Sequence, residues 1–259
     1  MSNLVKKNKY GAQNKGRIRV GFEGVGDRGA NGAAPSDIKR LSINEEKGRI
    51  KGGARNVAAT YVLRGYDGAD FKAQQAKLTE FAKANDCWFT IEEIEDEFGK
   101  EIFDRFEEIL GEKSPSRGME ARIYRYDENH FLKVYKYGYF NNTPLDFMDN
   151  RIALHNKEFP ETYYELVCFV EGRQGNLCFA LKQPVIIGVQ PTEKDIDNEM
   201  LEREYKKHEK EAYVYISKCG NYIIEDQHVK NWIKGFDGKM YCIDSVLKLN
   251  PQNRKYENI

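Results

Sequence analysis

The hydrophobic pattern of the chain changes its period near residue 118, and this change sets the class of fold. Before it, residues 69–85 repeat apolar side chains at helical spacing. After it, residues 120–126 and 131–137 alternate in the manner of strands and are rich in β-branched and aromatic side chains. The turn-forming residues 127–130 separate these two segments, so we predict a β-hairpin. The chain therefore combines helices with antiparallel strands in an α+β fold.

The strand period continues beyond this hairpin. A helix-compatible stretch follows Pro144, and two further strands are expected over 163–170 and 176–183. Residues from 118 to 183 thus read strand, strand, helix, strand, strand. The remaining predicted elements are a helix over 193–213 and short strands over 221–225 and 239–243.

The part of the chain before residue 112 divides in two by composition. Residues 1–55 carry thirteen Lys and Arg against five Asp and Glu, although the whole chain has 41 of each and no net charge. Such a basic, glycine-rich segment can bury little apolar surface, so we expect it to be flexible. Contact with nucleic acid or an acidic partner is the alternative. Residues 56–111 are expected to form a helical subdomain, in which Thr90 and Glu93 make a capping box.

Composition argues against several classes of protein. The first twenty residues lack the apolar core of a signal peptide. Apolar runs such as 184–187 are far too short to cross a bilayer, so no membrane contact is expected. The five cysteines are odd in number and include no C-x-x-C pair, which disfavours a disulfide scaffold or a zinc site. We therefore expect a cytoplasmic protein.

Four polar side chains stand where a phosphoryl-transfer site would need them. Lys133 lies inside an apolar strand segment, Asp226 ends a strand, and Asn231 follows five positions later. Asp244 closes a strand after the turn at 236–239, so a hairpin would bring Asn231 and Asp244 to one end of a small sheet. Transfer from ATP uses a lysine for phosphate charge, an aspartate for the acceptor hydroxyl, and amide and carboxylate oxygens for magnesium.

Each of these residues alone also has a purely structural explanation. Lys133 could be an edge-strand lysine whose ammonium group reaches solvent. Asp226, Asn231 and Asp244 are, one by one, ordinary turn formers or caps. Their combination and order along the chain favour a nucleotide site.

In this order the four residues resemble those of the protein-kinase-like superfamily. Asp226 and Asn231 match the catalytic-loop pattern D-x-x-x-x-N, and His228 makes the form closer to aminoglycoside phosphotransferases and HipA-like kinases. Asp244 takes the place of the aspartate in the D-F-G motif that binds magnesium. Lys133 takes the place of the lysine that kinases carry on a strand of the N-lobe.

More narrowly, residues from about 112 to 250 resemble the polyvalent protein kinase family, whose domains occur in phage and mobile-element proteins. The resemblance implies a reduced protein-kinase-like fold over 112–259, with an N-lobe over 112–183 and a minimal C-lobe over 184–259. The N-lobe would be an antiparallel sheet with one αC-like helix. The segments that carry the resemblance are Gly118–Ala121, Arg151–Asn156, Phe159–Thr162, Gln183–Pro184, Ile243–Asp244 and Leu249–Asn250.

The resemblance also implies how a nucleotide would bind. Gly118 would turn the loop over the phosphates, and Lys133 would pair with them. Backbone groups of the segment from Gln183 to Val185 would receive the adenine. An acid on the helix after residue 144 would pair with the lysine, and Asp149 is the nearest candidate, with Asp146 next.

For the chemical step, the resemblance implies that Asp226 is the catalytic base and that Asn231 and Asp244 bind magnesium. His228 would brace the site. The implied activity is an ATP- and Mg²⁺-dependent kinase that phosphorylates a protein Ser, Thr or Tyr or a small-molecule hydroxyl, in a phage or mobile-element context.

The chain also departs from protein kinases. Gly118 stands alone where they carry a glycine-rich loop, Ser245 follows Asp244 in place of phenylalanine, and only fifteen residues come after Asp244. No full activation segment is therefore expected. These departures leave an alternative open, a catalytically inactive pseudokinase that acts as a binding module.

Overall fold

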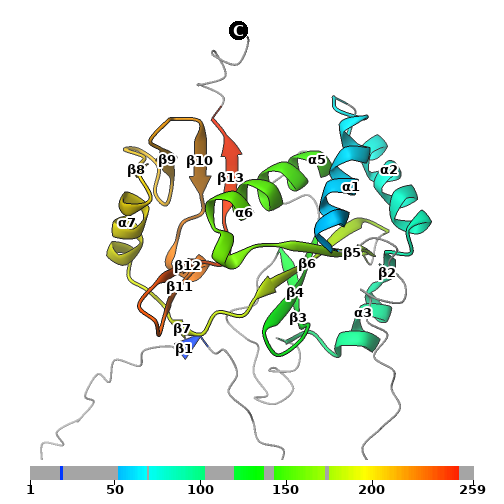
Figure 1. Cartoon of the computed structure of the whole chain (residues 1–259), viewed down its shortest axis with the longest axis horizontal. Helices are drawn as coiled ribbons and strands as arrows, with labels where there is room; N and C mark the ends of the chain where they lie inside the picture. The colour runs from blue at the N-terminus through cyan, green and yellow to red at the C-terminus, as the bar shows by residue number, and fades with distance from the viewer. Residues whose placement is uncertain are drawn as a thin grey trace, which may run out of the picture.

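The computed structural model contains three β-sheets with helices packed around them (Figure 1). Gly118 and nearly all of the basic segment 1–55 lie outside the residues that the structure describes. The mixed α+β architecture is confirmed. The described residues are 18–19, 52–68, 70–102, 120–136, 143–172 and 175–250.

The largest sheet has five strands in the order β2-β5-β6-β4-β3. The β3–β4 and β5–β6 pairs are the two antiparallel hairpins that the sequence predicts, and β4 also pairs with β6. At the far edge β2 runs parallel to β5, a strand that the sequence pattern does not predict because it is only three residues long. The bounds are β2 Trp88–Thr90, β3 Ala121–Arg125, β4 His130–Lys136, β5 Glu165–Glu171 and β6 Leu177–Pro184.

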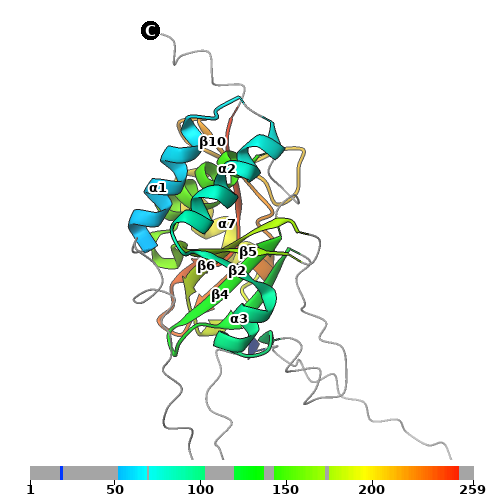
Figure 2. The same cartoon turned by 90° about the vertical axis from the view of Figure 1, so that its right-hand side faces the viewer.

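Three N-terminal helices cover this sheet and share its core (Figure 2). They are α1 (Gly52–Arg64), α2 (Phe71–Ala84) and α3 (Ile91–Phe98). Phe81 of α2 meets Phe169 of β5 edge to face, with ring centroids 6.4 Å apart. The predicted helix before residue 85 thus exists, and its apolar face is buried against the sheet rather than in a separate core.

The helix α3 begins at the capping box that the sequence predicts. The Glu93 N–H donates to Thr90 Oγ1 at 3.2 Å, and the Thr90 N–H donates to Glu93 Oε2 at 2.8 Å. Two of the N–H groups that a helix start leaves unpaired are satisfied in this way.

We expect Thr90→Ala to lower the free energy of unfolding by about 1 kcal/mol, because the alanine cannot accept the Glu93 N–H. Thr90→Ser keeps the hydroxyl and is the matched control, with stability near that of the wild type. Urea denaturation of the three proteins measures the difference. Equal stability of the alanine and serine variants would show that the cap does not contribute.

The stretch after residue 143 is helical as predicted, but its middle is wound as a π-helix. It consists of α5 (Pro144–Asp146), the π-helical η1 (Phe147–Leu154) and α6 (His155–Glu158). It begins with a second capping box, in which the Asp146 N–H donates to Thr143 Oγ1 at 3.2 Å. Phe147 stacks on Phe179 of β6 with ring centroids 4.3 Å apart, which fixes this helix against the large sheet. Wide π-turns inside helices frequently accompany functional sites.

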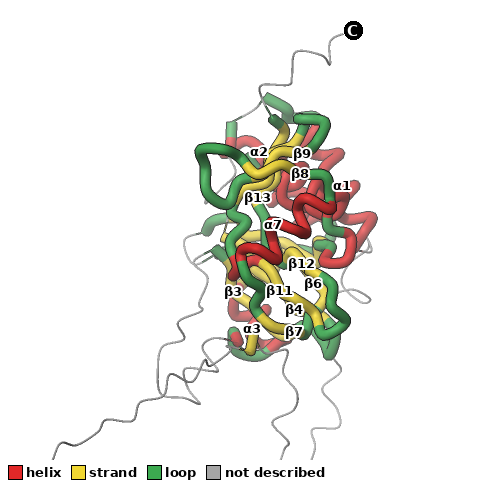
Figure 3. The backbone as a smooth tube through the Cα atoms, turned by 90° about the vertical axis from the view of Figure 1, so that its left-hand side faces the viewer, coloured by secondary structure: helices red, strands yellow, loops and turns green. Residues whose placement is uncertain are grey.

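Two four-stranded sheets form the rest of the fold around a second hydrophobic core (Figure 3). Their orders are β1-β7-β11-β12 and β13-β10-β9-β8, and the pairs within them are antiparallel. Trp232 and Phe159 meet edge to face in this core. The predicted strands at 221–225 and 239–243 correspond to β10 and β12. The bounds are β1 Ile18–Arg19, β7 Gly188–Val189, β9 Tyr215–Ser217, β10 Tyr222–Glu225, β11 Trp232–Gly235, β12 Met240–Cys242 and β13 Val246–Leu249.

The helix predicted over 193–213 is too long. α7 (Glu193–Glu202) is followed by Glu204 in the left-handed region, with φ 62°, and then by β8 (Tyr205–Lys207). The first residue of β8 is buried in the second core and lies opposite Ser217. Charged pairs at helical spacing stabilise a helix only weakly, so burial of one aromatic ring in a strand outweighs them.

Two exclusions can be compared with the structure. Within the described ranges, no helix combines the length and apolarity needed to cross a bilayer. The five cysteines are free thiols, in agreement with the prediction against a disulfide scaffold.

Candidate active site

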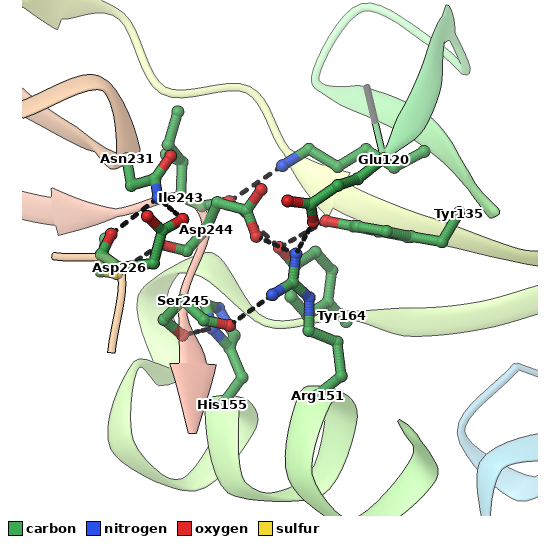
Figure 4. Close-up of polar contacts among 12 residues, drawn as sticks. Glu120, Tyr135, Arg151, His155, Tyr164, Asp226, Asn231, Ile243, Asp244 and Ser245 are labelled. Carbon is green, nitrogen blue, oxygen red and sulfur yellow. Dashed lines mark hydrogen bonds and ion pairs between the residues drawn. The ribbon is translucent and has the colours of Figure 1, made fainter. Parts of the chain in front are cut away.

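Asn231 and Asp244 lie at the open end of one hairpin, as the sequence predicts. β11 and β12 pair so that Trp232 lies opposite Cys242. One residue beyond, the Ile243 N–H donates to the Asn231 carbonyl at 2.9 Å. Asp244 directly follows Ile243, and Figure 4 shows its side chain between Asn231 and Arg151.

Asp226 is joined directly to Asn231. The Asn231 side-chain amide donates to Asp226 Oδ2 at 2.7 Å and to the Asp226 carbonyl at 2.8 Å. Both bonds use the amide nitrogen, so the Asn231 Oδ1 atom can still act as an acceptor. Asp226 has φ 62°, a left-handed conformation that few residues other than glycine adopt, and asparagine and aspartate tolerate it best. Such conformations cost energy and occur mostly where the fold requires one side-chain direction.

His228 braces Asp226 from the other side. Its Nδ1 accepts the Lys230 N–H at 3.2 Å, so the proton of the neutral imidazole lies on Nε2. This Nε2 is 3.2 Å from Asp226 Oδ1. Both carboxylate oxygens of Asp226 therefore have a neighbouring donor, one from Asn231 and one from His228.

Lys133 of β4 is buried and reaches across to the segment of Asp244. Its side chain is 7% exposed, and its Nζ donates to the Ile243 carbonyl at 2.9 Å. The same carbonyl accepts from the Tyr164 hydroxyl at 3.0 Å and from Gln183 Nε2 at 3.2 Å. Lys133 is thus not an edge-strand lysine that reaches solvent. It links the large sheet to the residue that precedes Asp244.

The carboxylate of Asp244 forms an ion pair with Arg151 of η1, a contact that the sequence analysis missed (Figure 4). Arg151 Nη1 also donates to the Ser245 carbonyl at 2.7 Å, and Nη2 lies 3.2 Å from Glu120 Oε2. The guanidinium lies over the Tyr135 ring, 5.0 Å from its centroid. The available signal for this role was the place of the arginine in the Arg151–Asn156 motif.

Asp149, the expected acid partner of Lys133, is placed elsewhere. Its carboxylate forms an ion pair with Arg64 of α1, with 2.9 Å between the nitrogen and oxygen atoms. Asp146, the second candidate, caps its own helix by accepting the Thr143 N–H at 3.1 Å. Residues two positions apart point to different sides of a helix, so when Arg151 faces Asp244, Asp149 faces away. In the region that the structure describes, the prediction of an Asp149–Lys133 pair is therefore corrected.

The segment expected to receive adenine is also engaged within the protein. Gln183 is 2% exposed, and its side-chain amide donates to the Thr162 carbonyl at 2.9 Å as well as to Ile243. The Val185 N–H donates to the Asn129 carbonyl of the β3–β4 turn at 2.7 Å. Gln183 thus supports the segment that precedes Asp244, and the backbone amide of Val185 is already paired.

The chain from residue 72 to residue 251 matches the family model described as the serine/threonine/tyrosine kinase found in polyvalent proteins. The chain belongs to this family. The match covers more than half of the chain and also includes α2, β2 and α3, which precede the part that the sequence motifs cover. Membership supports a phosphotransferase of the kinase type. No curated protein and no solved structure matches the chain.

The oxygen atoms of Asn231 and Asp244 are of the kind that could hold magnesium. Among the described residues, no group of three or more His, Cys, Asp or Glu side chains is arranged to hold a metal ion. Asn231 Oδ1 and the Asp244 carboxylate are hard oxygen donors, which magnesium prefers. Magnesium commonly binds through one or two carboxylates together with substrate phosphates and water, so this small set fits a nucleotide-bound ion.

Glu120 adds a third acidic group to the site. Burial and the nearby carboxylate of Asp244 raise the pKa of Glu120 to about 7, against the opposing effect of Arg151. A glutamate in the unfolded chain has a pKa near 4.3, so between about pH 4.3 and 7 the native state holds a proton that the unfolded state releases. This group therefore makes the native state less stable as the pH rises through that range.

We expect the free energy of unfolding of the wild type to fall between pH 5 and pH 7.5 by on the order of 2 kcal/mol more than that of Glu120→Gln. The glutamine has the same shape but does not titrate. Urea denaturation of both proteins at the two pH values, without divalent cations, measures this difference. Parallel pH profiles would contradict the raised pKa.

Proposed function

We propose that this chain is an ATP- and magnesium-dependent kinase that phosphorylates a protein Ser, Thr or Tyr or a small-molecule hydroxyl. The observation that carries the proposal is the convergence of four side chains on one short segment. Lys133 donates to the carbonyl of Ile243, the residue before Asp244, and the Ile243 N–H donates to Asn231, which binds Asp226. The order of these residues along the chain and their arrangement in space agree with one phosphoryl-transfer site.

In the proposed reaction, Lys133 exchanges its contact with the Ile243 carbonyl for the phosphates of ATP. Asn231 and Asp244 would hold magnesium, which would neutralise charge on the phosphates. Asp226 accepts the proton of the acceptor hydroxyl while that oxygen bonds to the γ-phosphorus and the bond to the β-phosphate oxygen breaks. ADP and the phosphate ester are the products.

His228 and Asn231 give Asp226 its orientation in this reaction. The Asn231 amide donates to Asp226 Oδ2 at 2.7 Å, and His228 Nε2 lies 3.2 Å from Asp226 Oδ1.

For the nucleotide, we place the adenine beside the segment from Gln183 to Val185; Gly118, which is expected near the phosphates, lies outside the residues that the structure describes. Because the Val185 N–H is paired with Asn129, the adenine would use other backbone groups of this segment. We also propose that the protein acts in a phage or mobile-element context and is located in the cytoplasm. Residues 1–55 would contact an acidic partner or nucleic acid.

Transfer of label from γ-³²P-ATP tests this function. We expect label on Ser, Thr or Tyr of the protein itself or of an added general protein acceptor, in the presence of Mg²⁺ and not after EDTA. Mass spectrometry of the labelled peptide identifies the hydroxyl. No incorporation above the EDTA control for the protein, added acceptors and small-molecule hydroxyls would contradict the proposal.

A second candidate is a binding module that keeps the fold without catalysis. The observation that favours it is that Lys133 contacts a carbonyl, while Asp149, the acid expected beside it, pairs with Arg64. A ligand that binds only the native state must raise its stability. Thermal unfolding with ATP and Mg²⁺ distinguishes the two, since a shift is expected for the kinase and none for a module that has lost nucleotide binding.

A further inference from the structure

Arg151 is a buried cation that the proposed reaction does not use. Its side chain is 4% exposed and lies on the helix face directed at Asp244. Burial of a guanidinium is costly unless charged and polar partners surround it. The partners described are the carboxylates of Asp244 and Glu120, the Ser245 carbonyl and the face of Tyr135.

The guanidinium grips Asp244 and its neighbour at the same time. One nitrogen pairs with the Asp244 carboxylate, and another donates to the Ser245 carbonyl at 2.7 Å. One turn further along the helix, His155 Nδ1 lies 2.9 Å from the Ser245 hydroxyl. The helix therefore holds the side chain of Asp244 and both the backbone and the hydroxyl of Ser245, the two residues before β13. A lysine, which lacks the planar fork, could not reproduce both contacts of Arg151.

Glu120 shares this guanidinium with Asp244. Its Oε2 lies 3.2 Å from Arg151 Nη2, the nitrogen that also contacts Asp244. Glu120 stands immediately before β3, so the two acids come from parts of the chain that are far apart in sequence. When Asp244 directs an oxygen to a cation, the ionised form of Glu120 can keep the buried positive charge paired.

We propose that Arg151 is a positioning residue that orients Asp244 for magnesium, with Glu120 as the acid that keeps Arg151 paired. This inference rests on the proposed function. In this proposal the helix contributes a positively charged arginine that contacts Asp244. The resemblance implied instead an acidic residue on this helix that would pair with Lys133. Groups that orient a metal ligand from behind typically change metal affinity 10- to 100-fold when they are lost.

The test measures the Mg²⁺ concentration that half-saturates the ATP complex, by titration of a fluorescent ATP analogue at fixed nucleotide concentration. We expect Arg151→Gln to raise this concentration about 10- to 100-fold. Affinity for the analogue in EDTA should stay close to the wild-type value, because Lys133 is unchanged. Arg151→Lys should lie between the two proteins.

The direction of the change in Mg²⁺ affinity shows whether Arg151 acts by orienting Asp244 or only through its charge. Loss of a positive charge beside Asp244 would by itself strengthen Mg²⁺ binding. Weaker binding therefore reports the loss of orientation. Arg203→Gln is the matched control, since Arg203 pairs with Glu199 and Glu161 and packs on Phe159 away from the site. Its Mg²⁺ requirement should equal that of the wild type.

If folded Arg151→Gln needs the same or a lower Mg²⁺ concentration for half-saturation than the wild type, the inference is overturned. If Arg151→Gln does not fold, an unchanged half-saturating concentration in Arg151→Lys overturns it. Wild-type protein that binds the analogue equally well with and without Mg²⁺ contradicts the proposed function and this inference together, whereas a wild-type response with unaltered Arg151 variants contradicts this inference alone.

Discussion

Replacing Asp226 with asparagine is expected to lower the rate of phosphoryl transfer by about 100- to 10,000-fold, the range that a positioned general base contributes. The amide cannot accept the proton of the acceptor hydroxyl. Asparagine tolerates the left-handed backbone of this position, with φ 62°, so the fold and nucleotide binding should be retained. Alanine would add strain and is the poorer test. The initial rate of phosphate incorporation from labelled ATP measures the effect.

Asp237→Asn is the matched control for Asp226. It makes the same change of charge in the exposed turn between β11 and β12, where Asp237 bonds to Tyr241. Its rate of transfer should equal that of the wild type. Equal rates for the Asp226 variant and this control would remove Asp226 from the chemical step.

Replacing Lys133 with methionine is expected to weaken ATP binding by about 10- to 100-fold, because a hydrogen bond to a charged group contributes about 1.5–3 kcal/mol. Methionine keeps most of the buried volume and removes the charge. The Ile243 carbonyl still accepts from Tyr164 and Gln183, so no acceptor is left unpaired. Calorimetry gives the ATP affinity, and thermal unfolding without ligand verifies that the variant is folded.

Lys182→Met is the control variant for Lys133→Met in the measurement of ATP affinity. Lys182 lies on the neighbouring strand β6, opposite Leu132, and pairs with Glu165 at 2.6 Å. Successive side chains of a strand point to opposite faces, so Lys182 and Lys133 face different sides of the sheet. ATP affinity should be unchanged in Lys182→Met. A similar loss in both variants would mean that Lys133 acts through the stability of the sheet.

The parts of the fold that local chemistry specifies could be predicted from the sequence. Thr90 and Glu93 start a helix because each satisfies the backbone N–H of the other. The hairpin that brings Asn231 and Asp244 together follows from a turn between two apolar strands, and the structure pairs those strands in that way. The structure also joins Asp226 to Asn231, the two residues that match the pattern D-x-x-x-x-N.

Contacts between distant segments could not be predicted in this way. Arg151 meets Asp244 across 93 residues of sequence, and the helical pattern does not specify which polar residue faces the site. The sequence favours Asp149 as the partner of Lys133 on residue type alone, and it does not show that Arg151 is buried between two acids from elsewhere in the chain. The early end of α7 has the same origin, since β8 is stabilised by pairing with β9.

We expect Lys133, Asp226, Asn231 and Asp244 to act on one bound nucleotide. A crystal structure of the protein with Mg²⁺ and a non-hydrolysable ATP analogue tests it most directly. We expect Lys133 Nζ on a phosphate oxygen, Asn231 and Asp244 on the magnesium ion, and Asp226 facing the γ-phosphate. A nucleotide bound at another surface, with Lys133 still on the Ile243 carbonyl, would contradict the account.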